Sequence, residues 1–267
     1  MNAIDYWKDQ WEIPTMNSSI TCTDYSTNIS AKNKPVIGRY YDINGKWLGD
    51  AKKNATNKIY VADSVEKDKE GNVIKAKNIT SLKVNYTIFQ RMAAVVYGES
   101  SAAYMNTMTT DLKHEMFALA SVHQLNSIAY GSRSVKADEY RRYSLEKIND
   151  DSFKLAANAA VINALLRGDD LSNGAIMWDG KEQALFDKSI NKEHVKMGNI
   201  TIELHMNTMG WTISDEHYNK WKKNIGDEFK APQEKKAVSG MNKDKMRLKS
   251  TAVYCRTIFW EFNEDEE

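Results

Sequence analysis

Hydrophobic and polar residues follow two different patterns along the chain, and the change comes near Thr87. Before it, VIGRYYDINGKWLGD (36–50) places β-branched and aromatic residues around Asn44-Gly45, a dipeptide that readily takes positive φ in a tight hairpin turn. NKIYVADSV (57–65) predicts a further strand, and KEGNVIKAKN (69–78) another turn. We therefore expect a small β-rich segment at 35–86, preceded at 1–34 by an irregular arm rich in Ser, Thr and Asn.

From Thr87 the apolar residues recur at helical spacing. The first predicted helix runs from Thr87 to about Gly98, with Thr87 and Gln90 at capping-box spacing. A second helix is expected after a cap at Asp111, and a third within 150–168, with acidic residues at its entry and Gly168 as its stop. The apolar faces of the three helices are formed by Ile88, Met92, Val95 and Val96; by Leu112, Met116, Leu119, Ala120 and His123; and by Phe153, Ala156, Ala160, Ile162 and Leu166.

The pattern weakens after Gly180. A strand is expected at NITIEL (199–204), and the final apolar stretch is STAVYCRTIFWEF (250–262). Together these patterns predict an α+β protein: a mainly helical body at 87–267 that carries the small β-rich N-terminal segment.

Charge and hydropathy exclude several classes of protein. The 37 basic residues balance 36 acidic ones, so there is no general electrostatic basis for binding nucleic acid. No run approaches the roughly 20 apolar residues that span a bilayer, so no membrane insertion is expected. The first residues, MNAIDYWKDQWEIPTMNSS, have neither the basic start nor the apolar core of a secretory signal. We therefore expect synthesis in the cytoplasm without such a signal.

The residues that commonly bind metals are poorly spaced for that purpose. His114-Glu115 and His123 resemble a zinc-protease motif, but its two histidines are four residues apart and these are nine apart. Cys22 and Cys255 fit neither a zinc knuckle nor a disulfide framework, and whether they pair is left open. No metal or cofactor is expected.

Glu99 is the main candidate for chemistry. It follows the apolar helix at its predicted end, where the helix dipole is negative, and the surrounding Val, Tyr and Ala residues are expected to desolvate it. Both effects favour a neutral carboxyl, which can protonate a glycosidic oxygen. The alternative is a carboxylate that hydrogen-bonds a neighbouring loop.

A second candidate segment is SNGAIMWDG (172–180). Trp178 beside Asp179 suits a sugar, because an aromatic ring covers its apolar face while a carboxylate binds its hydroxyls. The alternative is a turn whose Trp fills the core.

Four blocks of the sequence resemble, in the same order, the spore-cortex-lytic type of cell wall hydrolases. They are AAVVYGESS (93–101), EMFALASVHQLNSIAYG (115–131), AANAAVINALLRGDDLSNGAIMWDG (156–180) and YCRTIFW (254–260). The resemblance implies a lysozyme-like fold that cleaves peptidoglycan glycan strands between N-acetylmuramic acid and N-acetylglucosamine. It also implies that Glu99 is the catalytic acid of a lytic transglycosylase or muramidase.

The resemblance also implies a substrate cleft around Glu99. Asn126, Ser172, Gly174 and Ala175 match family positions, and the expected substrate-binding residues are Tyr97, Ser100, Asn126, Ser172, Asn173, Gly174, Trp178 and Asp179. If a water is activated, a second carboxylate is needed, and Asp179 or Asp111 would supply it. The chain departs from the family where Ser100 and Ser101 replace Ala and Arg, where a second acid is missing, and where Ser127 replaces Arg.

The expected partners follow from the substrate. A cell wall hydrolase without a secretory signal must leave by another route, such as a type VI secretion apparatus or phage lysis, and we favour an antibacterial toxin that the first of these exports to the periplasm or wall of a target bacterium. YDINGKWLGD (41–50) also resembles the front part of contact-dependent toxin domains. Such a toxin would need an immunity protein. The alternative is a non-catalytic peptidoglycan-binding or structural module of a secretion or phage particle.

Overall fold

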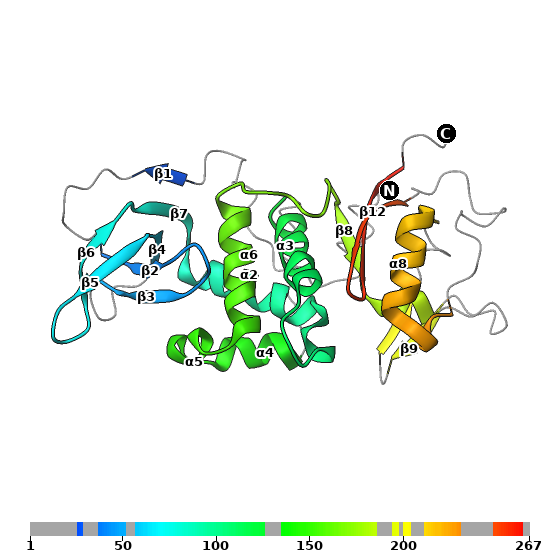
Figure 1. Cartoon of the computed structure of the whole chain (residues 1–267), viewed down its shortest axis with the longest axis horizontal. Helices are drawn as coiled ribbons and strands as arrows, with labels where there is room; N and C mark the ends of the chain where they lie inside the picture. The colour runs from blue at the N-terminus through cyan, green and yellow to red at the C-terminus, as the bar shows by residue number, and fades with distance from the viewer. Residues whose placement is uncertain are drawn as a thin grey trace. The chain divides into compact units, whose positions relative to one another are not determined.

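The computed structural model describes residues 26–28, 37–51, 57–125, 135–185, 194–197, 200–203, 211–230 and 248–263. These residues form both helices and strands, which confirms the α+β class (Figure 1). Their contacts divide the described chain into two compact units, which we call the first unit (through Asp170) and the second unit (from Leu171). The division falls inside the segment 87–267 that the sequence interpretation treats as one domain.

The first unit begins with a five-stranded sheet of order β1-β7-β4-β2-β3, in which only the β2–β4 pair is parallel. Its strands are β1 (Ser26–Asn28), β2 (Arg39–Tyr41), β3 (Trp47–Asp50), β4 (Lys58–Val61) and β7 (Thr80–Asn85); β5 (Ser64–Lys67) and β6 (Val73–Lys77) form a separate hairpin. The predicted turn at Asn44-Gly45 joins β2 to β3, and Gly45 has φ +83°. Stacked Tyr40 and Tyr60 rings, 5.3 Å apart, lie in the core of this β-rich part.

The three predicted helices are present in the first unit, with two shorter ones between them. They are α2 (Tyr86–Glu99), α3 (Thr110–Leu125), α4 (Val135–Arg142), α5 (Leu145–Asn149) and α6 (Ser152–Leu165). A 3₁₀ helix, η1 (Ser101–Tyr104), follows α2. α6 packs against α2 and α3, and its Ala156, Ala157 and Ala160 are buried small side chains that permit close packing. Figure 1 shows these helices.

The helix caps differ from the prediction at two of the three N-termini. The side chain of Asn85 accepts a hydrogen bond from the Ile88 N–H at 2.9 Å, so the predicted capping box of Thr87 and Gln90 is wrong. At α3 the Thr109 side chain accepts from the Leu112 N–H at 3.1 Å, and Asp111 lies inside the first turn and not at the cap position. At α6 the expected acidic entry is confirmed, because Asp151 is the N-cap.

Side chains of the helices hold the β2–β3 hairpin by hydrogen bonds to its backbone. The Asn158 side chain of α6 donates to the carbonyl of Gly45 at 3.0 Å. The Asn149 side chain both accepts from the Trp47 N–H at 2.8 Å and donates to the Trp47 carbonyl at 2.9 Å. The β-rich segment and the helices α2 to α6 therefore belong to one packed unit.

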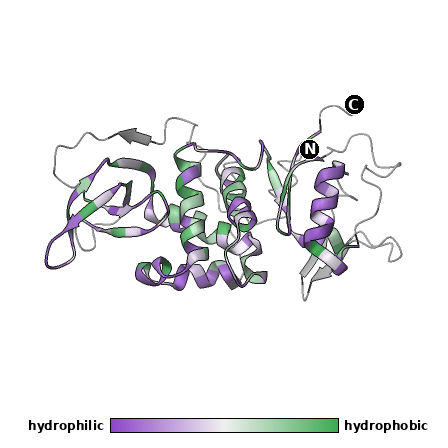
Figure 2. Ribbon diagram, viewed as in Figure 1, coloured by the Kyte–Doolittle hydropathy of each residue, from purple (hydrophilic) through white to green (hydrophobic). Residues whose placement is uncertain are grey.

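The described residues of the second unit form a four-stranded sheet of order β11-β12-β13-β8, a two-stranded sheet of β9 and β10, and a helix of 11 residues. Its elements are β8 (Met177–Asp179), β9 (His194–Met197), β10 (Ile200–Glu203), β11 (Trp211–Thr212), α8 (Asp215–Ile225), β12 (Leu248–Tyr254) and β13 (Thr257–Phe262). The expected strand in 199–204 is therefore present as β10. α8 is largely hydrophilic (Figure 2), and it contributes Tyr218, Trp221 and Ile225 to a core that also holds Trp211 and Trp260.

Cys255 lies in the turn between β12 and β13, where it is buried and not in a disulfide. Cys22 falls outside the described residues. Within the described ranges, no helix combines the length and the apolar character needed to cross a bilayer.

Candidate functional site

Glu99 is the last residue of α2, so the expected position at a helix end is confirmed. The expectation that apolar neighbours bury it is wrong, because Glu99 is exposed. From Met92 to Tyr97 every residue of α2 is buried, and burial falls off only over Gly98 and Glu99. The helix therefore leaves the core along its axis, and Glu99 is where it reaches solvent.

The residues that follow Glu99 are fixed by buried hydrogen bonds. The Ser100 hydroxyl donates to the carbonyl of Tyr97 at 3.0 Å, and the Ser100 N–H donates to the carbonyl of Val96 at 3.2 Å. Ser101 donates to the carboxylate of Glu115 twice, from its N–H at 2.7 Å and from its hydroxyl at 2.8 Å. The start of η1 is thus held against α3.

Glu115 is a residue that the sequence interpretation considered only as part of a zinc-like motif. Its side chain is 0% exposed, and it lies one turn from the buried Leu112 and Leu119 on α3. An acid at helical spacing within an apolar face is the signal that could have identified it, since a buried carboxylate requires hydrogen-bond donors. In the structure Ser101 provides two of them.

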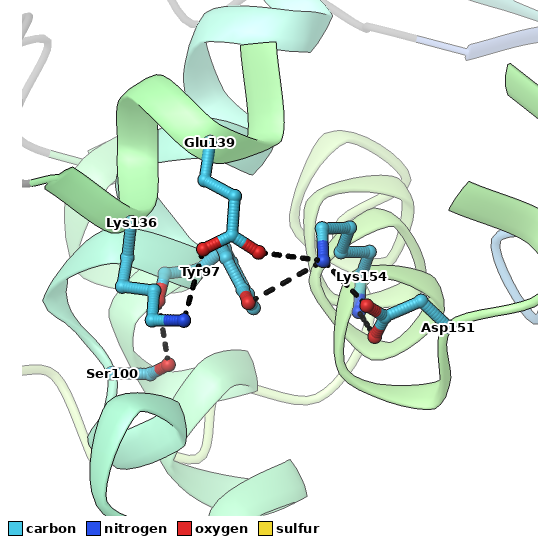
Figure 3. A network of polar contacts seen from close by, with 6 residues as sticks. All are labelled: Tyr97, Ser100, Lys136, Glu139, Asp151 and Lys154. Atoms are coloured by element: carbon cyan, nitrogen blue, oxygen red, sulfur yellow. Dashed lines mark hydrogen bonds and ion pairs between the residues drawn. The ribbon is translucent and has the colours of Figure 1, made fainter. Parts of the chain in front are cut away.

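The residue before the helix end, Tyr97, belongs to a second polar network built from α2, α4 and α6 (Figure 3). The Lys154 ammonium lies 3.4 Å from the Tyr97 hydroxyl and 3.3 Å from Glu139 Oε1, and it also pairs with Asp151 Oδ2. The Lys154 side chain is only 1% exposed. Lys136 pairs with the other Glu139 oxygen at 2.9 Å.

The ionisation of this network is set by burial and by its hydrogen bonds. Burial is the largest single influence on Lys154 and works against its charge, but the hydrogen bonds and charge interactions with Asp151 and Tyr97 together outweigh it and hold the pKa of Lys154 above its ordinary value. Burial also disfavours the charge on Glu139, yet hydrogen bonds from Lys136 and Lys154 lower its pKa. Burial raises the pKa of Tyr97, which stays neutral. The network is therefore a set of fixed charges around the neutral Tyr97 phenol. Through Tyr97 it positions α2.

The predicted residues of the 172–180 segment lie in the second unit. Ser172 is buried, and its carbonyl accepts from the Thr251 hydroxyl at 2.7 Å. Asn173 and Gly174 form an exposed turn with φ +55° and +83°, and the Asn173 side chain donates to the Thr251 carbonyl at 3.0 Å. These contacts fasten the turn to β12.

Asp179, offered as a second carboxylate, has a structural partner. It is buried, and its Oδ2 accepts from the Trp260 indole N–H at 2.8 Å. Trp178 is half-buried on β8 opposite Phe259. Asp111, the other suggested second carboxylate, is half-buried in the first turn of α3.

The predicted site residues thus fall into two groups. Tyr97, Glu99 and Ser100 lie together in the first unit, whereas Ser172, Asn173, Gly174, Trp178 and Asp179 lie in the second. Asn126 is outside the described residues. In the part of the chain that the structure describes, there is no group of three or more His, Cys, Asp or Glu side chains arranged to bind a metal.

No protein-family model matches the chain, and comparisons with curated proteins and with solved structures found no match either. Function is therefore inferred from the chemistry of the side chains around Glu99.

Proposed function

We propose that the chain cleaves the glycan strands of peptidoglycan and that Glu99 is the general acid. The observation that supports this most strongly is an exposed carboxyl group on a backbone fixed on both sides. Tyr97 before it contacts buried Lys154, and Ser101 after it contacts buried Glu115. A catalytic side chain must be accessible to a polymer and be carried on a well-positioned backbone, and the exposed Glu99 extends from such a backbone.

The proposed reaction needs one carboxyl group. Glu99 donates its proton to the glycosidic oxygen as the bond from that oxygen to C1 of N-acetylmuramic acid breaks. The 6-hydroxyl of the same sugar attacks C1 and gives its proton to the Glu99 carboxylate, which closes a 1,6-anhydro ring and restores the acid. Glu99 lies at the C-terminal end of α2, where the helix dipole is negative.

Hydrolysis by an activated water is the other form of this reaction. It requires a second carboxylate to act as base or nucleophile. The hydrogen bond from Trp260 occupies Asp179, and Asp111 is half-buried at the start of α3. These placements favour the transglycosylase reaction over hydrolysis. In this proposal, α2, α3 and α6 form the lysozyme-like body.

The biological setting that fits this activity is an antibacterial toxin. Its substrate lies in the periplasm or cell wall, so the chain would be exported there, with a type VI secretion apparatus as the proposed route. The producing cell would need an immunity protein, and the exposed end of α2 at Glu99 is the surface that such a partner would cover.

A second candidate function is glycan binding without cleavage, as in a structural module of a secretion or phage particle. The exposure of Glu99 favours it, because the carboxyl group lacks the apolar surroundings that keep other glycosidase acids neutral. The two candidates share a substrate and differ in whether a glycosidic bond is broken.

Digestion of purified peptidoglycan separates them. Released fragments are analysed by mass spectrometry after incubation with wild type, Glu99→Gln and Glu70→Gln; Glu70 is an exposed acid in the turn between β5 and β6. We expect anhydro-muropeptides from wild type and Glu70→Gln and none from Glu99→Gln. Reducing ends instead would indicate a muramidase, whereas intact glycan with folded wild type would refute cleavage.

A further inference from the structure

Tyr104 is a large aromatic residue that the fold leaves in solvent. Its exposed fraction is 53%, whereas Tyr40, Tyr97 and Tyr140 in the same unit are exposed by 5% or less. An exposed ring by itself is common on protein surfaces. What distinguishes Tyr104 is its place in the chain, because it is the last residue of η1, which begins two residues after Glu99.

The backbone of η1 limits how far Tyr104 can lie from Glu99. Ser101 is bound to Glu115, the Ser100 hydroxyl accepts from the Ala102 N–H at 3.4 Å, and the Met105 N–H donates to the Ala102 carbonyl at 3.4 Å. Ser100 is extended, with φ −74° and ψ 165°, and η1 rises about 2 Å per residue from Ser101 to Tyr104, so the backbone at Tyr104 lies at most about 13 Å from that at Glu99. This span is comparable to the length of one disaccharide.

The segment that follows Glu99 carries no charge of its own. Residues 100–110 read SSAAYMNTMTT and contain no charged side chain. Asn106 and Thr107 follow Tyr104 by two and three residues and are exposed, and they offer an amide and a hydroxyl. An aromatic ring with neutral polar neighbours matches a sugar, whose apolar face stacks on the ring while its hydroxyl and acetamido groups form hydrogen bonds. It does not match a phosphate-rich ligand, which requires basic side chains.

We propose that Tyr104 binds the glycan by stacking against the apolar face of an N-acetylated amino sugar adjacent to the scissile bond. This inference rests on the proposed function, because it takes the substrate class from it and names a residue that binds that substrate. Tyr104 acts in binding and takes no part in proton transfer.

The test measures binding separately from cleavage. In a Glu99→Gln background, affinity for purified peptidoglycan is measured by co-sedimentation, and affinity for soluble tetra-N-acetylchitotetraose by calorimetry. Tyr104→Leu removes the aromatic ring and keeps apolar bulk, whereas Tyr104→Trp keeps an aromatic ring. Ile74→Ala changes a residue that is 49% exposed on β6 and serves as the control. Thermal unfolding checks that each variant is folded.

We expect Tyr104→Leu to weaken both affinities about tenfold, and Tyr104→Trp and Ile74→Ala to bind within about twofold of the parent. With Glu99 restored, Tyr104→Leu should raise KM by a similar factor with little change in kcat. Equal binding by the Leu and Trp variants would overturn the role of the ring even if wild type cleaves. Ring-dependent binding by a wild type that does not cleave would support the role of Tyr104 while refuting the proposed reaction. A parent chain that binds neither probe would overturn the inference.

Discussion

Replacing Gly45 with Ala tests whether the β2–β3 hairpin packs against α6 as closely as the structure indicates. Gly45 has φ +83°, and a Cβ there would lie 2.4 Å from the Leu155 carbonyl oxygen and 2.6 Å from the Ala159 nitrogen. Both atoms belong to the backbone of α6, which cannot rotate away. Gly71, in the turn between β5 and β6, has nearly the same φ, +84°, but open space around its Cβ position. The two glycines form a matched pair.

The difference between the pair gives the magnitude of the contact. Placing Ala at positive φ costs about 1 kcal/mol, and this applies to both variants. Forcing an extra methyl group into a packed contact adds about 1–3 kcal/mol, and this applies to Gly45 alone. Loss of the 3.0 Å hydrogen bond from Asn158 to the Gly45 carbonyl would add about 1 kcal/mol. We therefore expect Gly71→Ala to lose about 1 kcal/mol of unfolding free energy and Gly45→Ala about 3 kcal/mol or more.

The assay is urea denaturation of both variants and wild type, followed by far-ultraviolet circular dichroism. Comparison of the midpoints at a common slope gives the change in unfolding free energy. Equal destabilisation by the two substitutions, within about 0.5 kcal/mol, would refute the close approach of the hairpin to α6.

Three further changes test the polar contacts. Lys154→Met should lower the unfolding free energy by about 2 kcal/mol in urea denaturation, less than loss of a fully buried pair, because its two acidic partners are 27% and 29% exposed and can rehydrate. This loss should be complete above the ordinary pKa of a glutamate and should shrink as the pH falls through the lowered pKa of Glu139. An unchanged unfolding free energy at neutral pH would contradict the network. Glu115→Gln should lower the unfolding free energy by about 1–2 kcal/mol, because an amide forms weaker hydrogen bonds with the buried donors of Ser101. An unchanged unfolding free energy in the same assay would show that the carboxylate charge does not contribute to stability. Asp179→Asn keeps an acceptor for Trp260 and should retain full glycan cleavage in a fragment-release assay, whereas loss of cleavage with an unchanged fold would make Asp179 catalytic.

Local signals in the sequence predicted much of the first unit. The dipeptide Asn44-Gly45 encodes its turn in two adjacent residues, and the apolar spacing of the helices is a property of each segment alone. The caps were harder to assign. Asn85 and Thr87 can both cap a helix, and only the path of the chain out of β7 decides that Asn85 does so.

The surroundings of Glu99 could not be predicted in the same way. Periodicity reports which side of a helix is buried, but α2 is buried on every side between Met92 and Tyr97 and becomes exposed only at its end. How far a helix extends beyond its core depends on the elements packed around it, which are distant in the sequence. Lys154 and Glu115 were overlooked for a related reason, because charged residues are normally solvated and the partners Tyr97, Glu139 and Ser101 come from other helices.

The boundary between the units also depends on distant pairings. Strand β8 pairs with β13, so residues 177–179 join a sheet completed some eighty positions later. Nothing in the local pattern around Leu171 indicates that the chain leaves the first unit there. Long-range strand pairing of this kind carries no short-range signal.

The most direct test of the proposed activity is the initial rate of fragment release from purified peptidoglycan by wild type, Glu99→Gln and Glu70→Gln at equal concentration. Loss of a general acid reduces the rate by roughly 10²–10⁴-fold. We predict a fall of at least about a hundredfold for Glu99→Gln and an unchanged rate for Glu70→Gln. Equal rates for folded Glu99→Gln and wild type, or no release by any of the three, would contradict catalysis by Glu99.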